Sequence, residues 1–209
     1  MHPLTIIVTS CDRFDLLEKT LDSFFALNNY PYVAFHVHND SVNDVPNYLK
    51  NKYKLAGITW HQGTKRGLSA SWDYLVSLVE TEYFFNIEDD WKFEGNPNFI
   101  RHSIGIMDLF KWVDQVWIRD KKDHNHPIEV SELSIMFEYV LENGDWCGFT
   151  FNPSVRKLSK WHEWFPFGIA GKDEIELSRE LKGKYNAVSL NYPSIRHIGG
   201  GRHSKGFKI

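Results

Sequence analysis

The 209 residues suit one domain, or one domain with a small appendage, and 42% of them are hydrophobic, enough for a real core. The 24 Lys and Arg residues and 27 Asp and Glu residues give a formal net charge of -3, which excludes a broad basic surface for nucleic acid. No window has about 18 continuous apolar residues, and no signal peptide is expected at the N-terminus, so a membrane span is not predicted. The two cysteines, Cys11 and Cys147, predict no disulfide framework and favour a reducing compartment such as the cytoplasm.

The first ninety residues alternate between strand and helix patterns. Residues 4–9 form a β-branched run that predicts a buried strand, and an amphipathic helix follows with Leu17 and Leu21 on its apolar face. Asp15 and Glu18 have the spacing of a capping box at the start of that helix, and Asp12 is an alternative cap. Further strands are predicted at 33–38, 58–61 and 83–87, and further helices at 46–53 and 69–80.

The second half of the chain is less regular. The patterns predict a helix after residues 96–97, a short strand at 116–118, a charged loop at 119–127, a strand at 146–151, a helix at 173–181 and a C-terminal loop. There is no repeat and no low-complexity tract, so a single domain over residues 1–209 is expected. The last eight residues have the composition of a tail or of a linker to a longer chain.

The alternation of strands and helices predicts a mostly parallel sheet with right-handed crossovers. Ligands of such sheets bind outside the carboxyl ends of the strands. Polar or charged residues stand at all four predicted ends, which are 10–13, 39–44, 63–67 and 88–91. These four segments should therefore converge on one edge of the sheet.

The segment "FFNIEDDW" is the sharpest chemical feature, because Glu88, Asp89 and Asp90 directly follow a hydrophobic strand. Three adjacent carboxylates repel one another unless a cation or hydrogen-bond donors compensate. Hard oxygen ligands favour Mg²⁺ or Mn²⁺, which share their remaining coordination with water and phosphate. A solvated acidic turn is the alternative interpretation of the same three residues.

Four segments resemble, in order and at similar spacing, the GT-A fold and within it the family 2-like inverting glycosyltransferases. "TIIVTSCDRFDLLEKTLDSFF" resembles the opening strand, turn and helix of that family, and "VHNDSVND" resembles its second, acidic turn. "KRGLSASWDYLV" resembles the segment that leads into the third helix, and "NIEDDW" resembles the aspartate-x-aspartate element in a glutamate-led variant.

The resemblance implies an α/β fold with a Rossmann-like, mixed and mostly parallel sheet flanked by helices. Residues 1–95 would bind a nucleotide-diphosphate sugar with UDP as the expected nucleotide, and residues 96–209 would bind a saccharide acceptor. The size and the aromatic content of 15% are also similar to those of a glycosyltransferase domain from a large chlorella virus, an origin that would place the protein in the host cytoplasm.

The resemblance also implies roles for individual residues. Asp40 matches the acidic residue that pairs with the nucleotide base, Glu88 matches a position near the ribose, and Asp90 matches the metal ligand. Glu88 replaces the usual aspartate and Trp91 stands where another acid is common, which leaves the donor open. The residues expected at the nucleotide or its phosphates are Ser10, Asp12, Arg13, Asp40, Lys65, Arg66, Glu88 and Asp89.

An inverting transferase needs a carboxylate to remove the proton of the acceptor hydroxyl. The segment "FGIAGKDEIELSREL" delivers Asp173 and Glu174 at the start of a predicted helix and resembles the family's Glu-Asp element. Because the order here is Asp-Glu, either residue fits, with Asp173 slightly favoured. The alternative is structural, since acids in the first helical turn are favoured by the helix dipole alone.

The late segment "SIRHIGGGRHS" contains His197 and His203. In related enzymes a late histidine completes the metal shell, and His197 is the expected ligand, which favours Mn²⁺ over Mg²⁺. The glycines after His197 suit a close approach of the backbone to a phosphate. A surface loop with incidental histidines is the alternative.

Other functions fit the sequence less well. A sugar nucleotidyltransferase usually has a glycine-rich signature after the first strand, and "TSCDRF" has none. No G-x-G-x-x-G follows that strand either, which argues against an oxidoreductase. A non-catalytic sugar- or nucleotide-binding module stays open. Three tryptophans are candidates for acceptor stacking or for the core, namely Trp146, Trp161 and Trp164, and the 119–127 loop with His124 and His126 is expected to be solvated.

Overall fold

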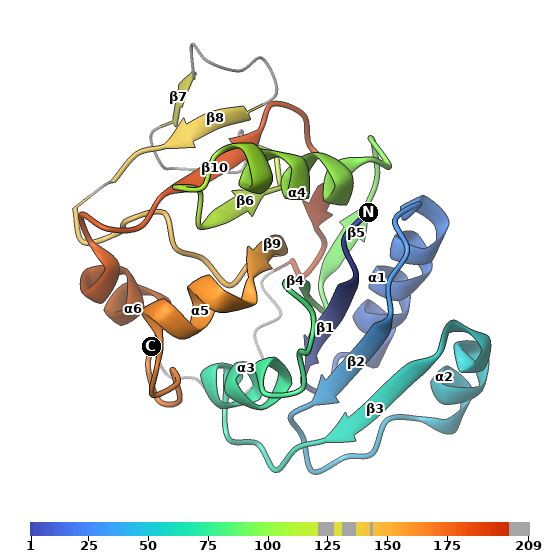
Figure 1. Ribbon diagram of the computed structural model, residues 1–209. Coiled ribbons are helices and arrows are strands. Elements are labelled where there is room, and N and C mark those ends of the chain that lie inside the picture. Colours follow the sequence, from blue (N-terminus) through green and yellow to red (C-terminus); the bar gives the residue numbers. More distant parts are fainter. Residues whose placement is uncertain (121–127, 131–136, 143, 201–209) are drawn as a thin grey trace.

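A nine-stranded sheet forms the centre of the part of the chain that the computed structural model describes, which is residues 1–120, 128–130 (backbone alone), 137–142 and 144–200. The strand order is β3-β2-β1-β4-β9-β6-β10-β8-β7 (Figure 1). Seven strands run in one direction and β9 and β8 run against them. The expected mixed, mostly parallel sheet is confirmed. The strands are β1 (Leu4–Ser10), β2 (Ala34–Asn39), β3 (Ile58–Gln62), β4 (Tyr83–Glu88), β6 (Gln115–Trp117), β7 (Ile128–Val130), β8 (Phe137–Val140), β9 (Ser154–Lys157) and β10 (Ala187–Leu190).

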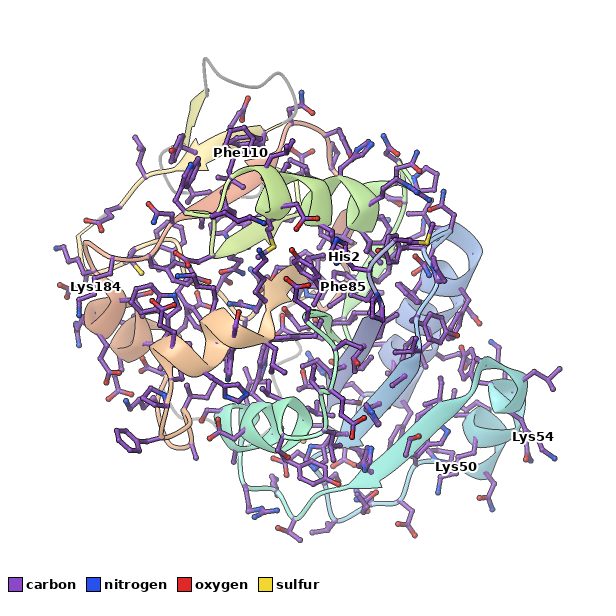
Figure 2. The ribbon with its side chains drawn as sticks, in the orientation of Figure 1. His2, Lys50, Lys54, Phe85, Phe110 and Lys184 are labelled. Carbon is purple, nitrogen blue, oxygen red and sulfur yellow. The ribbon has the colours of Figure 1, made fainter. Side chains whose placement is uncertain are left out.

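Helices cover both faces of the sheet and create two hydrophobic cores. Every residue of β1 is buried, and its alternating side chains divide between the cores, with Ile6 in one and Ile7 in the other. Phe85 of β4 lies deep in the molecule, whereas Lys54 and Lys184 extend at its periphery (Figure 2). The first core contains α1 (Phe14–Leu27), α2 (Asn47–Lys52) and α4 (Phe99–Leu109), and the second contains α3 (Leu68–Val76), α5 (Leu158–Trp164) and α6 (Glu174–Leu181). A short 3-10 helix, η1 (Lys54–Ala56), precedes β3.

The order of the strands changes in the second half of the sheet. Strand β9 pairs antiparallel with both β4 and β6, so Ser154 lies opposite Asn86 on one side and Trp117 on the other. Several fully buried side chains of this half are polar, including Gln115 and Arg156. Buried polar groups need hydrogen-bond partners, so the second half is held by a polar network as well as by apolar packing.

A separate two-stranded sheet joins the end of the chain to the segment after β4. Strand β5 (Trp91–Phe93) pairs antiparallel with β11 (Ile195–His197), which places His197 opposite Trp91. The backbone N–H of Ile198 also donates to the carbonyl of Asp90 at 2.8 Å. This pairing brings two segments more than a hundred residues apart to the same place.

Several local predictions were wrong. Helix α1 begins at Phe14 after Arg13, without the side-chain cap predicted at its start. Residues 146–151 are not a strand; the strand lies at β9 instead, and the predicted C-terminal loop contains β10 and β11. Helix α3 ends at Val76 rather than at residue 80. Local patterns failed where short elements depend on distant partners.

No helix in the described ranges is long and apolar enough to cross a bilayer. His124 and His126 of the predicted charged loop, and His203 near the C-terminus, lie outside the described residues.

Candidate active site at the carboxyl edge of the sheet

The first four strands end side by side, as the sequence predicts. Backbone hydrogen bonds join the ends, because Asp40 N donates to Ser10 O at 2.8 Å and Gly63 N donates to Asn39 O at 2.7 Å. Strand β4 ends at Glu88 beside them, since Thr9 of β1 pairs with Glu88. The carboxyl edge of the sheet therefore gathers the four polar segments into one site.

Asp89, the middle acid of "EDD", is buried and acts as an internal anchor. Its Oδ2 accepts from Ser10 Oγ at 2.9 Å and from Cys11 N at 3.3 Å. The guanidinium of Arg13 forms an ion pair with the same carboxylate, whose side chain is 0% exposed. Burial raises the pKa of Asp89 to about 6, against the opposing effect of the Arg13 charge. Asp89 thus holds the turn after β1 in place and does not face the site.

Asp90 is the one of the two aspartates that meets His197. Its Oδ2 lies 3.2 Å from His197 Nε2 and 2.7 Å from Arg13 Nη1. The pairing of β5 with β11 creates this contact. A carboxylate oxygen and an imidazole nitrogen thus converge, and Arg13 supplies the positive charge beside them.

Asp90 and His197 have the chemistry of two ligands of a divalent cation. Adjacent ligands of an octahedral ion at about 2.1 Å are roughly 3 Å apart, which matches the distance between Asp90 Oδ2 and His197 Nε2. A Cβ on Gly199 would come within 2.7 Å of Asp90 Oδ2 and 2.8 Å of His197 Nε2, so the glycine leaves space against both atoms. The described residues contain no group of three or more acidic, His or Cys side chains suited to a metal. Further ligands would therefore be water or phosphate oxygens.

Glu88 faces the same edge from the end of β4. Its Oε2 accepts from Trp91 Nε1 at 3.2 Å. Burial, with a further contribution from the charge of Asp90, raises the pKa of Glu88 to about 8. In the amide orientation that satisfies both neighbours, Asn152 donates to Glu88 Oε2 at 3.2 Å and accepts from Arg119. Glu88 therefore connects the acidic turn to Arg119 after β6.

The two candidates for the general base have different positions. The Asp173 carboxylate caps α6, accepting from Glu176 N at 2.8 Å in a capping box, and Asp173 is exposed. The Glu174 carboxylate turns inward, where its Oε2 accepts from Thr150 Oγ1 at 3.0 Å and from Phe151 N at 2.9 Å. Burial raises the pKa of Glu174. Asp173 therefore has a structural role as the cap of α6, and Glu174 is the buried carboxylate of the two.

Asp40, the candidate for base recognition, holds the loop after β3. Its carboxylate accepts from Arg66 N at 3.0 Å and from Gly67 N at 2.6 Å, and Gly67 precedes α3. A side chain at position 63 would come within 2.6 Å of Asp40 Oδ1, so the loop can pack this closely because residue 63 is glycine. Asp40 therefore fixes the wall of the site that the β3–α3 loop forms.

Asp12, Lys65 and Arg66 lie around this wall. Asp12 has a φ of 57°, in the left-handed region that Asp tolerates, and its Oδ1 accepts from Asn43 Nδ2 at 3.1 Å. Lys65 and Arg66 are exposed, and the Lys65 charge lowers the pKa of the Cys11 thiol against the larger raising effect of burial. The exposed positive charges of the β3–α3 loop thus lie near the turn after β1.

Sequence reasoning missed Arg119 and Asn152 as parts of the site. Arg119 follows β6, which runs in the direction of β4 because both pair antiparallel with β9, so Arg119 lies at the carboxyl edge. Its guanidinium lies 5.6 Å from the centre of the Trp91 ring. Its position directly after a predicted strand was a usable signal. Asn152 offered no signal because it follows an irregular segment. Trp146 and Trp161 are buried in the second core.

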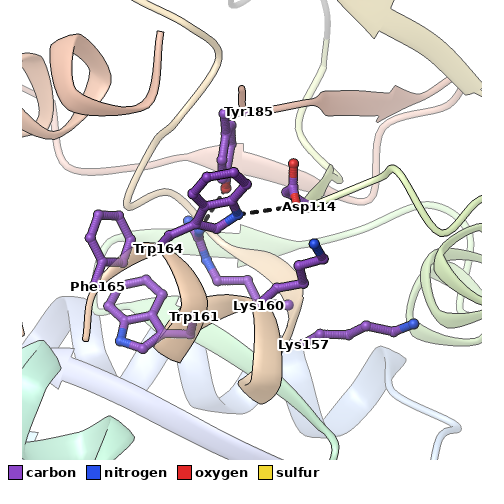
Figure 3. Close-up of a pocket in the computed structure, with 8 residues that line it drawn as sticks. Asp114, Lys157, Lys160, Trp161, Trp164, Phe165 and Tyr185 are labelled. Carbon is purple, nitrogen blue, oxygen red and sulfur yellow. Dashed lines mark hydrogen bonds between the residues drawn. The ribbon is translucent and has the colours of Figure 1, made fainter. Parts of the chain in front are cut away.

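A small cavity lies at the opposite, amino edge of the sheet (Figure 3). Its volume is about 10 Å³, which suits a single water and is far too small for a nucleotide sugar. Trp164 closes it by donating from Nε1 to Asp114 Oδ1 at 3.2 Å, and Tyr185 and Trp161 line it (Figure 3). This cavity is therefore not the donor site.

Neither a protein-family model nor a curated protein matches the sequence. Solved structures do match. S. aureus TarS residues 1–349 in complex with UDP-GlcNAc is similar with a TM-score of 0.67 and 14% identity over 99% of this chain and 62% of that one. Mannosyltransferase PcManGT from Pyrobaculum calidifontis, in complex with GDP-Man and Mn²⁺, is similar with a TM-score of 0.64 and 14% identity over 89% of this chain and 54% of that one.

The chain spans less than two thirds of the length of these proteins and about 36% of a longer TarS structure, which it matches with a TM-score of 0.63 and 13% identity. At these identities the similarity concerns the fold. The order of the elements, the mostly parallel sheet and the matched structures agree on one architecture, and the protein has the GT-A glycosyltransferase fold.

Proposed function

We propose that this protein is a metal-dependent, family 2-like inverting glycosyltransferase that moves a hexose from a nucleotide diphosphate, UDP in the first instance, to a hydroxyl of a saccharide. The observation that carries the proposal is the convergence of Asp90 and His197 with the inward-facing Glu174 near Glu88, at the edge where GT-A folds bind nucleotide sugars. The matched structures with UDP-GlcNAc and with GDP-Man and Mn²⁺ support the substrate class.

The donor side is assigned to the first half of the sheet. Asp12 and Asp40 border the base and ribose, and Lys65 and Arg66 lie beside the diphosphate. Asp90 and His197 would hold a Mn²⁺ or Mg²⁺ ion, with phosphate oxygens as further ligands. When bound, such an ion neutralises the charge that builds up on the leaving diphosphate.

The acceptor side is assigned to Glu174. Its carboxylate is held by Thr150 and Phe151, which fixes the direction in which it can accept the proton of an attacking hydroxyl. Inversion requires that this group lies on the face of the sugar opposite the leaving group. A raised pKa suits a base that must accept a proton near neutral pH.

Calorimetric titration tests the donor side. Nucleoside diphosphates and sugar nucleotides are titrated with and without Mn²⁺ into the wild type, Asp90→Ala and a control, Asp145→Ala, which changes an exposed carboxylate paired with Arg179. We expect one nucleotide to bind in a Mn²⁺-dependent way to the wild type and to the control but not to Asp90→Ala. Folded protein that binds no nucleotide would contradict the proposal.

NMR of the reaction product tests the transfer itself. With the donor identified, incubation with a saccharide acceptor should give a glycoside of inverted anomeric configuration. Donor binding with no transfer to any saccharide would instead indicate a nucleotide-sugar binding module. A location in the cytoplasm, of a host cell if the chain is viral, stays a prediction.

A further inference from the structure

We propose that Arg156 is a positioning residue for the general base: it holds the Thr150–Phe151 backbone against the Glu174 carboxylate and places a buried positive charge beside it. This inference rests on the proposed role of Glu174. Arg156 lies on β9 between β4 and β6, in the middle of the sheet, and is only 3% exposed.

Arg156 has an unusual set of partners for a buried arginine. Its Nε donates to Asn86 Oδ1 at 3.2 Å, its Nη1 donates to Tyr185 Oη at 3.0 Å, and its Nη2 donates to the carbonyl of Thr150. All three acceptors are neutral oxygens. The guanidinium also lies 5.0–5.5 Å from the ring centres of Phe149, Trp72 and Trp161. Burial of a charge without a contacting carboxylate is costly, which indicates a role for this charge beyond packing.

The segment that Arg156 holds has no strand to fix it. Residues 147–153 are irregular, so side chains must satisfy and orient their backbone groups. Gln115 contributes to this, since its Nε2 donates to Thr150 O at 3.0 Å and its Oε1 accepts from Tyr185 Oη at 2.8 Å. Arg156 on β9 and Gln115 on β6 therefore both donate a hydrogen bond to the Thr150 carbonyl.

Thr150 connects these hydrogen bonds to the Glu174 carboxylate. Its Oγ1 and the N–H of Phe151 are the two donors to Glu174 Oε2. One residue thus separates the buried guanidinium from the carboxylate. A shift of Thr150 would move both donors and hence the orientation of Glu174.

The charges around Glu174 come from several elements. Glu88 on β4 is a second acid near it, and each of the two has a raised pKa. Arg119 after β6 and Arg156 on β9 carry positive charge, while Asp173 caps the helix of Glu174 and Glu176 lies in its first turn. Both arginines oppose the raising effect of burial on the Glu174 pKa. Because Arg156 is enclosed, solvent screens its charge little.

The test compares Arg156→Met and Arg156→Lys with Arg179→Met, which changes an exposed arginine on α6. The Glu174 carboxyl is titrated by ¹³C NMR, assigned with Glu174→Gln, and kcat/KM is measured against pH. We expect Arg156→Met to raise the Glu174 pKa, to move the acidic limb of kcat/KM to higher pH, and to lower kcat on the order of 10²-fold with little change in donor KM. Arg179→Met should change none of these.

Arg156→Lys keeps the charge but cannot make three fixed hydrogen bonds, so it should lower kcat while moving the Glu174 pKa less than Arg156→Met does. Arg156→Lys also tests the proposal if Arg156→Met does not fold. An unchanged kcat in folded Arg156→Lys overturns the proposal. An unchanged Glu174 pKa in folded Arg156→Met overturns it as well. The NMR titration needs no turnover, so it reports on Arg156 even if the protein transfers no sugar.

Discussion

The two halves of the sheet are built in different ways. In the first half, parallel strands of five to seven residues pair with one another, and each ends in a polar segment at one edge. In the second half, strands of three or four residues pair out of order, and buried polar side chains such as Gln115 and Arg156 join them. The first half thus positions the residues proposed to bind the donor through the backbone, and the second positions Glu174 through Thr150, Phe151 and the side chains that hold them.

This difference teaches where each half is sensitive to change. A ladder of backbone hydrogen bonds tolerates many substitutions, because its bonds do not depend on side-chain identity. A side-chain network loses several contacts with one substitution. Function in the second half should therefore depend on individual side chains whose importance could not be predicted from the sequence pattern.

The largest effect is expected from the second half, at Glu174. Glu174→Gln keeps the shape of the side chain but removes the base, so kcat should fall about 10²–10⁴-fold with nucleotide affinity unchanged. Asp173→Asn is the matched control, because that side chain caps α6 and asparagine also caps well. Kinetics and calorimetry check both variants, and a loss of turnover in Asp173→Asn with normal turnover in Glu174→Gln would reverse the assignment.

The next effect concerns stability in the first half. Asp89→Asn removes the fully buried carboxylate that pairs with Arg13, Ser10 and the backbone of Cys11, and should lower the free energy of unfolding by about 3 kcal/mol. Asp90→Asn leaves the ion pair of Arg13 with Asp89 in place, and the asparagine oxygen can still accept from Arg13, so the loss should be smaller, about 1 kcal/mol. Denaturant unfolding measures both values. Equal losses in the two variants would contradict the separation of anchor and ligand.

A smaller effect tests the point where the chain end meets β5. Gly199→Ala places a methyl group 2.7 Å from Asp90 Oδ2 and should weaken Mn²⁺ binding roughly 10–100-fold, as measured by electron paramagnetic resonance. Gly105→Ala is the control, since a Cβ there meets nothing within 4 Å inside α4. It should instead stabilise the fold by about 0.5–1 kcal/mol. Normal Mn²⁺ affinity in Gly199→Ala would exclude the assigned position of the ion.

The smallest effect is a pH dependence at the outer strands of the first half. His36 Nδ1 and His61 Nε2 lie 3.1 Å apart on β2 and β3, and Tyr74 Oη lies 2.9 Å from His61 Nδ1. Burial lowers the pKa of both histidines below the ordinary 6.5, so the unfolded chain takes up protons first. The contribution of these histidines to the free energy of unfolding should therefore be complete above pH 6.5 and be lost as the pH drops below it. Unfolding at several pH values should give a shallower fall in His61→Gln, and an identical fall would contradict this.

Much of the first half could be predicted from the sequence. The periodicity of the strands located β1 to β4, and the rule for parallel sheets brought Ser10, Asp40 and Asp90 to one edge. The orientation of single side chains could not be predicted. Asp89 and Asp90 look equivalent in "EDD" and both pair with Arg13, and only the contacts of Asp89 with the turn after β1 and of Asp90 with His197 separate the anchor from the candidate ligand.

The second half gave weaker local signals for physical reasons. The strand "SVRK" has one apolar residue, because Ser154 and Arg156 are buried through hydrogen bonds rather than hydrophobicity. The choice between Asp173 and Glu174 depends on where α6 begins, and boundaries shift by a residue or more in any sequence-based prediction. The roles of the site residues in binding and catalysis stay predictions.

Anomalous diffraction tests the central claim most directly. A crystal of the protein with Mn²⁺ and the nucleoside diphosphate that binds in calorimetry should give a manganese peak within about 2.3 Å of both Asp90 Oδ2 and His197 Nε2, with phosphate oxygens completing the shell. The donor site would then lie at the carboxyl edge of the first half. A bound nucleotide with no manganese peak there, and with Arg13 still paired to Asp90, would contradict metal-dependent donor binding.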